Sequence, residues 1–487
     1  MKWPGTHVAY ALIMALFGQT TAGIHMGLIL INLATAALVF LLTRRVCGDA
    51  AGVVAAGTYA LLSISPPTLG LAAHATHFVM LPSLAGVLLV QNLDDRASLA
   101  RVFGAGLLLG LAALMKQSGA AFGLFAAGWI VWCELSPKSR NWRRLAMRLG
   151  CLALGGLLPF IVTCSILVLA GVFDHFWVWT FQYAHTYASI LTLAGGAGNL
   201  FDAASRLFIA APGLWAAAGL GLFLLFCERS VRCWRFFVLG FAFFSFLAVC
   251  PGGYFRKHYF LLLIPTAGLL AGVAAQAAYG WIVRLRLPVH PTAVPLLLFA
   301  GVALWSLFES RDIFFQLTPA QACRAVYGLN PFPESVEIGR YLASHCSPDA
   351  RIAVIGSEPQ IYFYGHRHSA TGYIYTYPLM EPQPYAVQMQ KEMIQEIEKA
   401  NPDYVVFVHV STSWLQRPDS NRLIFDWFEK YQQEHLQLVG LVDILSANRT
   451  EYRWLSPQGP VTPPRSEYWL TILKNRLPSD SATPKLK

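Results

Sequence analysis

The sequence predicts an α-helical polytopic membrane protein of about ten transmembrane helices, followed by an external α/β domain. Three observations predict it. The 487 residues are 55% hydrophobic and only 13% charged, whereas an ordinary soluble domain carries roughly 25% charged residues. Apolar runs follow one another up to residue 309, and beyond residue 330 strand-like runs alternate with helix-like segments. A soluble cytosolic enzyme, a disordered chain and a coiled coil are therefore excluded.

The apolar runs also set the expected organisation of the chain. Ten spans are predicted, over 23–43, 51–69, 76–91, 102–115, 118–133, 149–171, 205–227, 234–250, 259–283 and 291–308. The expected parts are an interfacial segment over 1–22, a transmembrane domain over 23–309, a linker over 310–330, an external α/β domain over 331–476 and a disordered tail over 477–487. Residues 8–17 are too short to span and are expected to form an interfacial or re-entrant helix. The alternative is a tight hairpin of 8–17 with 23–43.

Lys116 interrupts what would otherwise be one apolar run over 102–133. A lysine inside a span costs about 2.5–3.5 kcal/mol on insertion scales. A single long helix would also invert every later loop relative to the positive-inside rule. We therefore place a break between two helices at Lys116-Gln117-Ser118-Gly119.

The basic residues predict the topology. The net charge is +10, but residues 331–487 carry 15 Lys and Arg against 17 Asp and Glu, so the excess lies in the apolar part. Of the 21 basic residues before position 331, 14 fall in one set of alternate loops: Arg44, Arg45, Arg96, Arg101, Lys138, Arg140, Arg143, Arg144, Arg148, Arg229, Arg232, Arg235, Arg284 and Arg286. Those loops are expected to be cytoplasmic, which places residues 310–487 outside. The charges form no single patch, so nucleic acid is not an expected partner.

This topology also puts the N-terminus outside, with no span or signal peptide before it. We therefore expect that one further helix and an external loop lie upstream of Met1.

Two groups of cations lie on the predicted external side, against the positive-inside trend. One is Lys116, and the other is the run Arg256-Lys257-His258. We predict that these four residues bind a phosphate group at the level of the lipid headgroups, because Arg and Lys make charge-assisted hydrogen bonds to phosphate oxygens. The alternative is anchoring to ordinary lipid headgroups.

An aromatic segment over 172–204 is expected to be a long external loop. Its Trp177, Trp179, Tyr183 and Tyr187 suit the membrane interface, where Trp and Tyr gather. The alternative is a lid whose aromatic faces stack on an acceptor sugar or a prenyl chain.

No cofactor is required by the sequence, and dependence on a divalent metal is left open. His74 and His77 have the spacing of a metal-binding pair, but two ligands without a third are a weak signal. No CxxC pair or phosphate-binding Gly-rich loop occurs. Cys323 and Cys346 are expected to be free thiols, with a disulfide between them as the alternative.

The C-terminal domain is predicted to hold a parallel sheet. Strands are expected over 351–356, 403–408 and 437–445, and helices over 386–400 and 420–436. Open α/β sheets often bind ligands at the carboxyl ends of their strands, which is where Ser357-Glu358-Pro359-Gln360 lies. Asn448-Arg449-Thr450 matches a glycosylation sequon, a short and weak motif.

Several motifs, in order, resemble those of one membrane protein class. They are Lys2-Trp3-Pro4-Gly5 through Tyr10 with Phe17-Gly18, then Arg44-Arg45 through Gly48, then Gly110 through Gly119, and the run RKHYFLLLIP over 256–265. Residues 356–375 resemble the external domain of one bacterial branch. The chain thus resembles the GT-C-fold membrane glycosyltransferases, labelled family 39 or RgtA/B/C/D-like, which include protein mannosyltransferases and lipid A aminoarabinose transferases.

The resemblance implies an inverting glycosyltransferase. Such an enzyme moves a hexosyl or pentosyl group from a polyprenyl-phosphate donor to a lipid, glycan or protein acceptor. It implies a bacterial inner membrane location, with the C-terminal domain on the periplasmic side. Lys116, Arg256 and His258 match positions expected to contact the donor phosphate, where cations stabilise the charge on the leaving group.

The resemblance also implies an acidic residue in a first external loop, acting on the acceptor. No acid of this sequence occupies that position, so the catalytic carboxylate is expected upstream of Met1, and this chain alone is expected to transfer no sugar. Two alternatives stay open: a catalytically inactive scaffold that displays the external domain, and a transporter or flippase.

Overall fold

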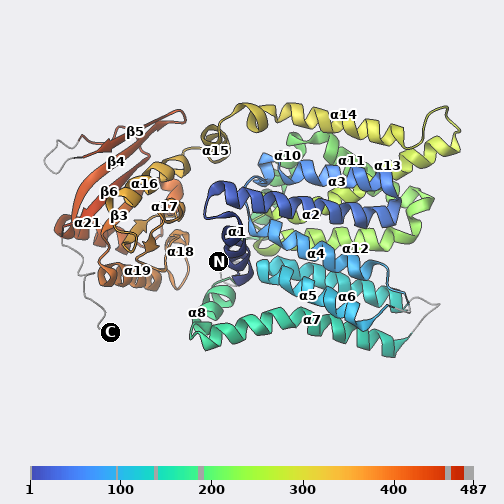
Figure 1. Ribbon diagram of the computed structural model, residues 1–487, viewed down its shortest axis with the longest axis horizontal. Helices are drawn as coiled ribbons and strands as arrows, with labels where there is room; N and C mark the ends of the chain where they lie inside the picture. The colour runs from blue at the N-terminus through green and yellow to red at the C-terminus, as the bar shows by residue number, and fades with distance from the viewer. Residues whose placement is uncertain (1–2, 95–96, 136–140, 185–190, 456–461, 477–487) are drawn as a thin grey trace. The chain divides into compact units, whose positions relative to one another are not determined.

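The computed structural model describes residues 3–94, 97–135, 141–184, 191–455 and 462–476 (Figure 1). The chain forms two compact units, Met1–Arg311 and Asp312–Lys487. The first is a bundle of helices: α1 Pro4–Phe17, α2 Thr21–Cys47, α3 Asp49–Ser63, α4 Ala75–Gln91, α5 Leu99–Met115, α6 Ala120–Leu135, α7 Trp142–Leu169, α8 Phe173–Trp177, α10 Leu193–Ala210, α11 Pro212–Cys227, α12 Arg235–Val249, α13 Ile264–Arg284 and α14 Ala293–Glu309.

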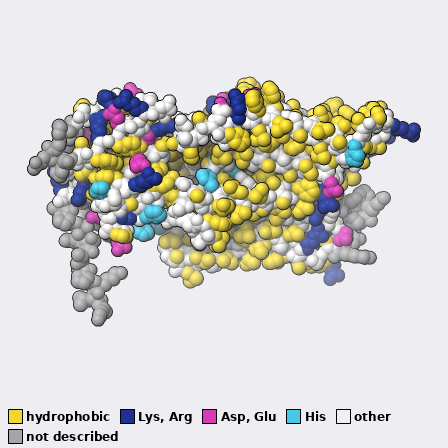
Figure 2. All heavy atoms as spheres, turned by 45° about the horizontal axis from the view of Figure 1, so that its top comes forward, with side chains coloured by type: hydrophobic (Ala, Val, Ile, Leu, Met, Phe, Trp, Pro, Cys, Tyr) yellow, Lys and Arg dark blue, Asp and Glu magenta, His cyan; other side chains and the backbone are white. Residues whose placement is uncertain are grey.

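The predicted spans correspond to helices of this bundle, which confirms the fold class. Among the described residues, five helices are long and apolar enough to cross a membrane, or six if α10 and α11 form one bent span. Helices α4, α5 and α14 are apolar but shorter. Figure 2 shows hydrophobic side chains over much of one face of the bundle. Several of them are largely exposed, including Leu154 on α7 (66%) and Leu297 on α14 (70%), as expected for side chains that contact lipid. The protein is therefore a multi-pass membrane protein.

The break at Lys116 is confirmed. Helix α5 ends at Met115, Lys116 is extended (φ −161°, ψ 141°), and a 3₁₀ turn over Gln117–Gly119 leads into α6. Gly119 is needed here, since a Cβ on it would lie 2.5 Å from the carbonyl oxygen of Ala112.

Glycine allows close packing inside the bundle. A Cβ on Gly106 of α5 would lie 2.2 Å from the oxygen of Leu152, and one on Gly155 of α7 would lie 2.2 Å from that of Phe103. The two backbones are therefore nearly in contact. Packing through small residues is how helices associate where water supplies little driving force.

The structure corrects two local predictions. The expected span over 205–227 is bent by 111° between α10 and α11, at Ala211 and Pro212. Proline fits the first turn of the new helix, because the nitrogen there needs no hydrogen bond. The expected loop over 172–204 contains α8, a π-helical turn over Val178–Gln182 and the first two thirds of α10.

The second unit surrounds a six-stranded sheet. Its strands are β1 Arg351–Ile355, β2 His368–Ser369, β3 Tyr404–His409, β4 Leu436–Ser446, β5 Arg449–Trp454 and β6 Trp469–Asn475. Its helices are α15 Pro319–Tyr327, α16 Phe332–His345, α17 Gln360–Gly365, α18 Tyr377–Met380, α19 Ala386–Ala400, α20 Ser411–Trp414 and α21 Leu423–His435.

The strand order β2-β1-β3-β6-β4-β5 makes the sheet mixed rather than parallel. Strands β2, β1 and β3 are parallel neighbours, as predicted for 351–356 and 403–408. The third predicted strand, β4, does not follow them, because β6 inserts between β3 and β4 and runs antiparallel to both. Buried aliphatic residues of β1, β3, β4 and β6 form the core with α16.

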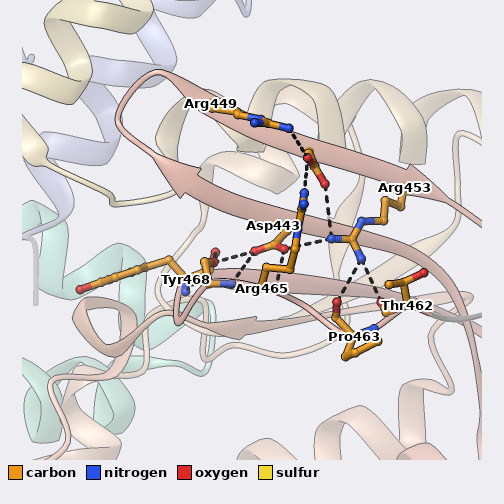
Figure 3. A network of polar contacts seen from close by, with 9 residues as sticks. Asp443, Arg449, Arg453, Thr462, Pro463, Arg465 and Tyr468 are labelled. Carbon is orange, nitrogen blue, oxygen red and sulfur yellow. Dashed lines mark hydrogen bonds and ion pairs between the residues drawn. The ribbon is translucent and has the colours of Figure 1, made fainter.

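A polar network holds the segment that leads into β6 (Figure 3). The fully buried Asp443 of β4 accepts hydrogen bonds from Arg453 (3.0 Å), from the backbone N–H of Arg465 (2.8 Å) and from the hydroxyl of Ser466 (2.6 Å). Burial raises the pKa of Asp443, but these hydrogen bonds and the Arg453 charge outweigh it and lower the pKa below its usual value. The carboxylate therefore fixes the start of β6.

Candidate functional site

Segments that are far apart in the sequence meet at one end of the helical bundle. They are the start of α1, the Lys116 turn, the residues after α8, the start of α10, and the residues between α12 and α13. Three hydrogen bonds join them: Thr6 Oγ1 to the Met115 oxygen (2.7 Å), Gln117 Nε2 to the Thr180 oxygen (3.1 Å) and Asn199 Nδ2 to the Gly253 oxygen (3.2 Å). All lie on the side of the membrane that the sequence predicts to be external.

The Lys116 turn meets the Arg256–His258 segment at this end. The Nζ atom of Lys116 lies 3.3 Å from the ring centroid of Tyr259, the geometry of a cation–π contact. Although 143 positions separate Lys116 from Tyr259 in the sequence, the Lys116 turn thus contacts the segment that carries the other predicted cations. We call Lys116, Arg256, Lys257, His258 and Tyr259 the cation cluster.

Histidine rings extend the cluster towards α4. The ring of His258 stacks on that of His74, with centroids 4.3 Å apart and planes at 11°, and meets Tyr259 edge-on at 4.9 Å. His74 precedes α4 as its N-cap residue. These contacts hold His258 between two aromatic neighbours.

The backbone before α13 presents the two other cations outward. Gly252 and Gly253 have positive φ values of 74° and 65°, and Phe255 adopts φ 41°. A positive φ in a bulky residue is rare, and such strain gathers at functional sites. Arg256 and Lys257 then follow, both exposed, and the Arg256 guanidinium lies 5.4 Å from the ring centroid of Tyr254.

His74 and His77 do not act as a pair. The side chain of His77 is buried, and its Nδ1 lies 3.1 Å from Oδ1 of Asn32, which also accepts a hydrogen bond from Tyr59. Within the described ranges, no group of three or more His, Cys, Asp and Glu side chains could hold a metal ion.

The aromatic residues predicted as an interface belt or a lid pack among themselves. Trp177 is 42% exposed and lies 4.4 Å from Phe181, while Tyr183 is buried and meets Trp179 edge-on at 5.6 Å. Tyr187 lies outside the described residues. Trp3 joins this group through contacts with Phe160, Phe176 and Phe181.

In the C-terminal unit, the residues after β1 form a buried network. Glu358, 2% exposed, accepts a hydrogen bond from Ser413 Oγ (2.7 Å), which in turn accepts one from the Ser357 N–H (2.8 Å). Burial raises the pKa of Glu358 to about 7, and the hydrogen bonds from Ser413 and Ser357 oppose that shift. Gln360 donates to Ser335 Oγ (3.0 Å). The segment over 357–360 thus ties β1 to its neighbours. Cys323 and Cys346 are free thiols.

Sequence reasoning found the cations but missed what holds them. Tyr259 and His74 complete the cluster. Gln117 links the Lys116 turn to the π-helical turn after α8, and Asn199 of α10 bonds to Gly253. The only available signal was the pair of tyrosines, Tyr254 and Tyr259, that flanks the cationic run.

The chain is thus a polytopic membrane protein whose helical bundle carries cationic and aromatic side chains together at one end. Residues 3–169, about a third of the chain, match the family model of the dolichyl-phosphate-mannose-protein mannosyltransferases. Comparison with curated protein sequences finds no match.

Solved structures are similar to nearly the whole chain, including the residues that the family model does not match. The chain is similar to ArnT from Cupriavidus metallidurans in the apo state, with a TM-score of 0.50 and 15% identity, covering 97% of this chain and 87% of that one. It also matches the oligosaccharyltransferase AglB from Archaeoglobus fulgidus, solved with an inhibitory peptide and a dolichol-phosphate, with a TM-score of 0.47 and 13% identity, covering 94% and 67%. The chain therefore has the GT-C fold of membrane glycosyltransferases, as the resemblance in its sequence predicted.

Proposed function

We propose that the protein transfers a sugar from a polyprenyl-phosphate donor to an acceptor at the outer face of a bacterial inner membrane. The observation that carries the proposal is the cation cluster, in which Lys116 lies over the ring of Tyr259, the residue that directly follows Arg256-Lys257-His258. The family whose model matches residues 3–169 is named for dolichyl-phosphate-mannose, a donor of this kind.

The cluster fits the chemistry of the donor. When the glycosidic bond to the lipid phosphate breaks, negative charge develops on the leaving phosphate, and preorganised cations lower the energy of that state. The Nζ atom of Lys116 lies over the Tyr259 ring, and this contact fixes a positive charge at this end of the bundle. Arg256, exposed and extended, offers a planar fork that matches phosphate oxygens.

In this proposal each residue of the cluster has a role at the donor end. Lys116 and Arg256 contact the phosphate, while Lys257 adds attraction for the anionic headgroup. His258, stacked on His74, donates a hydrogen bond from its ring N–H to the same phosphate. The aromatic segment with Trp177 and Tyr183 covers the prenyl chain or the acceptor. The sugar is transferred with inversion, and its acceptor is a lipid, glycan or protein.

A transfer assay tests the proposal. Membranes containing the protein expressed with its native upstream reading frame are given a polyprenyl phosphate that carries a radiolabelled sugar, and label is followed into the acceptor fraction. Lys116→Met is expected to lower the rate about 100-fold, in the range found when a group that stabilises developing charge is removed. Arg143→Met, at an exposed arginine near the start of α7, serves as the matched control. Equal rates in wild type and Lys116→Met would refute the role of the cluster.

A further inference from the structure

The sheet of the C-terminal unit carries a groove that none of the roles above uses. It has a volume of about 810 Å³ and lies where β3 ends and β6 begins. Its walls come from the last residues of β3, from α20 and the residues that follow it, from α21, and from Trp469. It therefore lies at the carboxyl edge of the parallel strands, where open α/β sheets bind ligands.

Aromatic rings form one wall of this groove. His409 and Trp469 are directly opposite each other in the β3–β6 pairing, and their rings stack with centroids 3.4 Å apart and planes at 10°. Two residues earlier on β3, Phe407 stacks on Phe428 of α21 at 4.1 Å and 13°. Burial lowers the pKa of His409 to about 4, so this wall is uncharged at neutral pH.

Polar side chains form the remainder of the lining. Ser411, Gln416 and Gln432 supply hydroxyl and amide groups, each able to donate and to accept hydrogen bonds. Arg422 and Glu429 add one positive and one negative charge. Because these charges balance, the groove favours an uncharged, hydroxyl-rich ligand over a phosphate or an acidic peptide.

The groove is held open by contacts behind its walls. The Trp414 indole donates to the Val408 oxygen (2.8 Å), and Ser413 is fixed by Glu358. Asp443 fixes the residues just before Trp469 through Arg465 and Ser466 (Figure 3). At the rim, Leu415 is 50% exposed and adopts φ 50°. A preformed site spends less conformational entropy on binding than a flexible one.

We propose that this groove binds an uncharged sugar unit of the acceptor glycan. A sugar ring presents a face of C–H groups that packs on a flat aromatic surface, and its edge of hydroxyls suits amide and hydroxyl partners. That the sugar belongs to an acceptor rests on the proposed glycosyltransferase function. The binding of a sugar by the groove does not depend on that function.

Binding of neutral saccharides to the full chain in lipid nanodiscs tests the inference. The probes are neutral trisaccharides of glucose, galactose, mannose and N-acetylglucosamine, followed by saturation-transfer NMR. At least one probe is expected to bind, and Trp469→Ala is expected to weaken its affinity about tenfold, since the variant removes the aromatic face on which the sugar ring packs. Trp469→Phe, which keeps a ring, is expected to retain most of the affinity and shows that loss in the alanine variant is not misfolding.

A second aromatic stack on the same unit provides the matched control. Trp454 of β5 stacks on Tyr341 at 4.0 Å and 1° and is 41% exposed, but it does not line the groove. Trp454→Ala is therefore expected to bind as wild type does. Failure of every probe to bind, unchanged binding in Trp469→Ala, or an equal loss in Trp454→Ala would each overturn the inference.

The Lys116→Met variant separates this inference from the proposed function. It is expected to bind the saccharide normally while losing activity with the lipid donor. If saccharide binding were absent while transfer from the lipid donor was intact, only the proposal that the groove binds a sugar would be refuted. If the saccharide bound but transfer did not depend on Lys116, the proposed role of the cation cluster would be refuted and the groove would remain a glycan-binding site.

Discussion

Two groups of cations, one at each end of the helical bundle, are held in different ways. At the end predicted to be cytoplasmic, Glu134 pairs with Arg144 (2.7 Å) and with the buried Arg148, and Glu228 pairs with Arg284 (2.5 Å). At the other end, Lys116 and Arg256 lie over tyrosine rings. A carboxylate neutralises the charge of a cation, whereas a tyrosine ring carries no charge and does not. The first arrangement stabilises the fold, and the second suits the binding of an anion.

The largest expected effect is on stability, at the paired end. Glu134→Ala leaves Arg148, which is 1% exposed, without its carboxylate partner, although its hydrogen bond to the Asp94 oxygen remains. Removing one member of a buried ion pair costs about 3–5 kcal/mol. Thermal unfolding in detergent, followed by tryptophan fluorescence, should show this loss, whereas Lys116→Met should stay close to wild type. Equal destabilisation by both variants would remove the contrast between the ends.

Glu358 extends the comparison to a buried carboxyl group held by hydroxyl and amide groups in place of a cation. Its pKa is about 7 in the folded protein and 4.5 without the fold. Its contribution to stability is therefore complete below pH 4.5 and is lost as the pH rises through 7, because the unfolded chain ionises first.

Glu358→Gln removes this pH dependence and should stabilise the protein at pH 8 by about 3 kcal/mol. Unfolding of the full chain at pH 5 and pH 8 measures the difference. Glu434→Gln, at an exposed position on α21, is the control. A gain of the same size at both pH values would argue against a raised pKa.

At the cation cluster, the next largest effect is on binding. Arg256→Ala should weaken the affinity for polyprenyl phosphate ten- to hundredfold, since hydrogen bonds to charged groups contribute about 1.5–3 kcal/mol. The unfolding temperature should not change, because Arg256 is exposed. Affinity can be measured by native mass spectrometry in nanodiscs. An unchanged affinity would assign Arg256 to lipid anchoring.

The smallest expected effect is that of the tyrosine under Lys116. Tyr259→Leu removes the ring and should lower the same affinity about fivefold, given a cation–π contribution of about 1 kcal/mol. Tyr259→Phe keeps the ring and should stay within a factor of two. If the phenylalanine variant lost as much as the leucine variant, the hydroxyl and not the ring face would be the important group.

Much of the fold could be predicted from the sequence because its causes are local. The cost of placing Lys116 in an apolar run predicted the end of α5, and apolar length predicted the helices. The bend before Pro212 was missed because the apolar run continues through it. Strand β6 was missed too, and its insertion beside β3 is a long-range pairing that no local pattern specifies.

The candidate site was predictable in its cations but not in its assembly. Lys116 and Arg256 stood out because they lie where the positive-inside rule expects few charges. The stacking of His74 on His258 joins residues 184 positions apart and depends on how α4 packs beside the segment before α13. The groove beside Trp469 depends on β6 and was not predicted for the same reason.

The most direct test of the cation cluster is the affinity of the full chain for polyprenyl phosphate relative to polyprenol of the same chain length. The two lipids differ only in the phosphate, so their ratio isolates what the headgroup contributes. The cluster predicts that wild type and Arg143→Met prefer the phosphate by at least tenfold and that Lys116→Met loses most of this preference. The same ratio in all three proteins would contradict a phosphate site at Lys116.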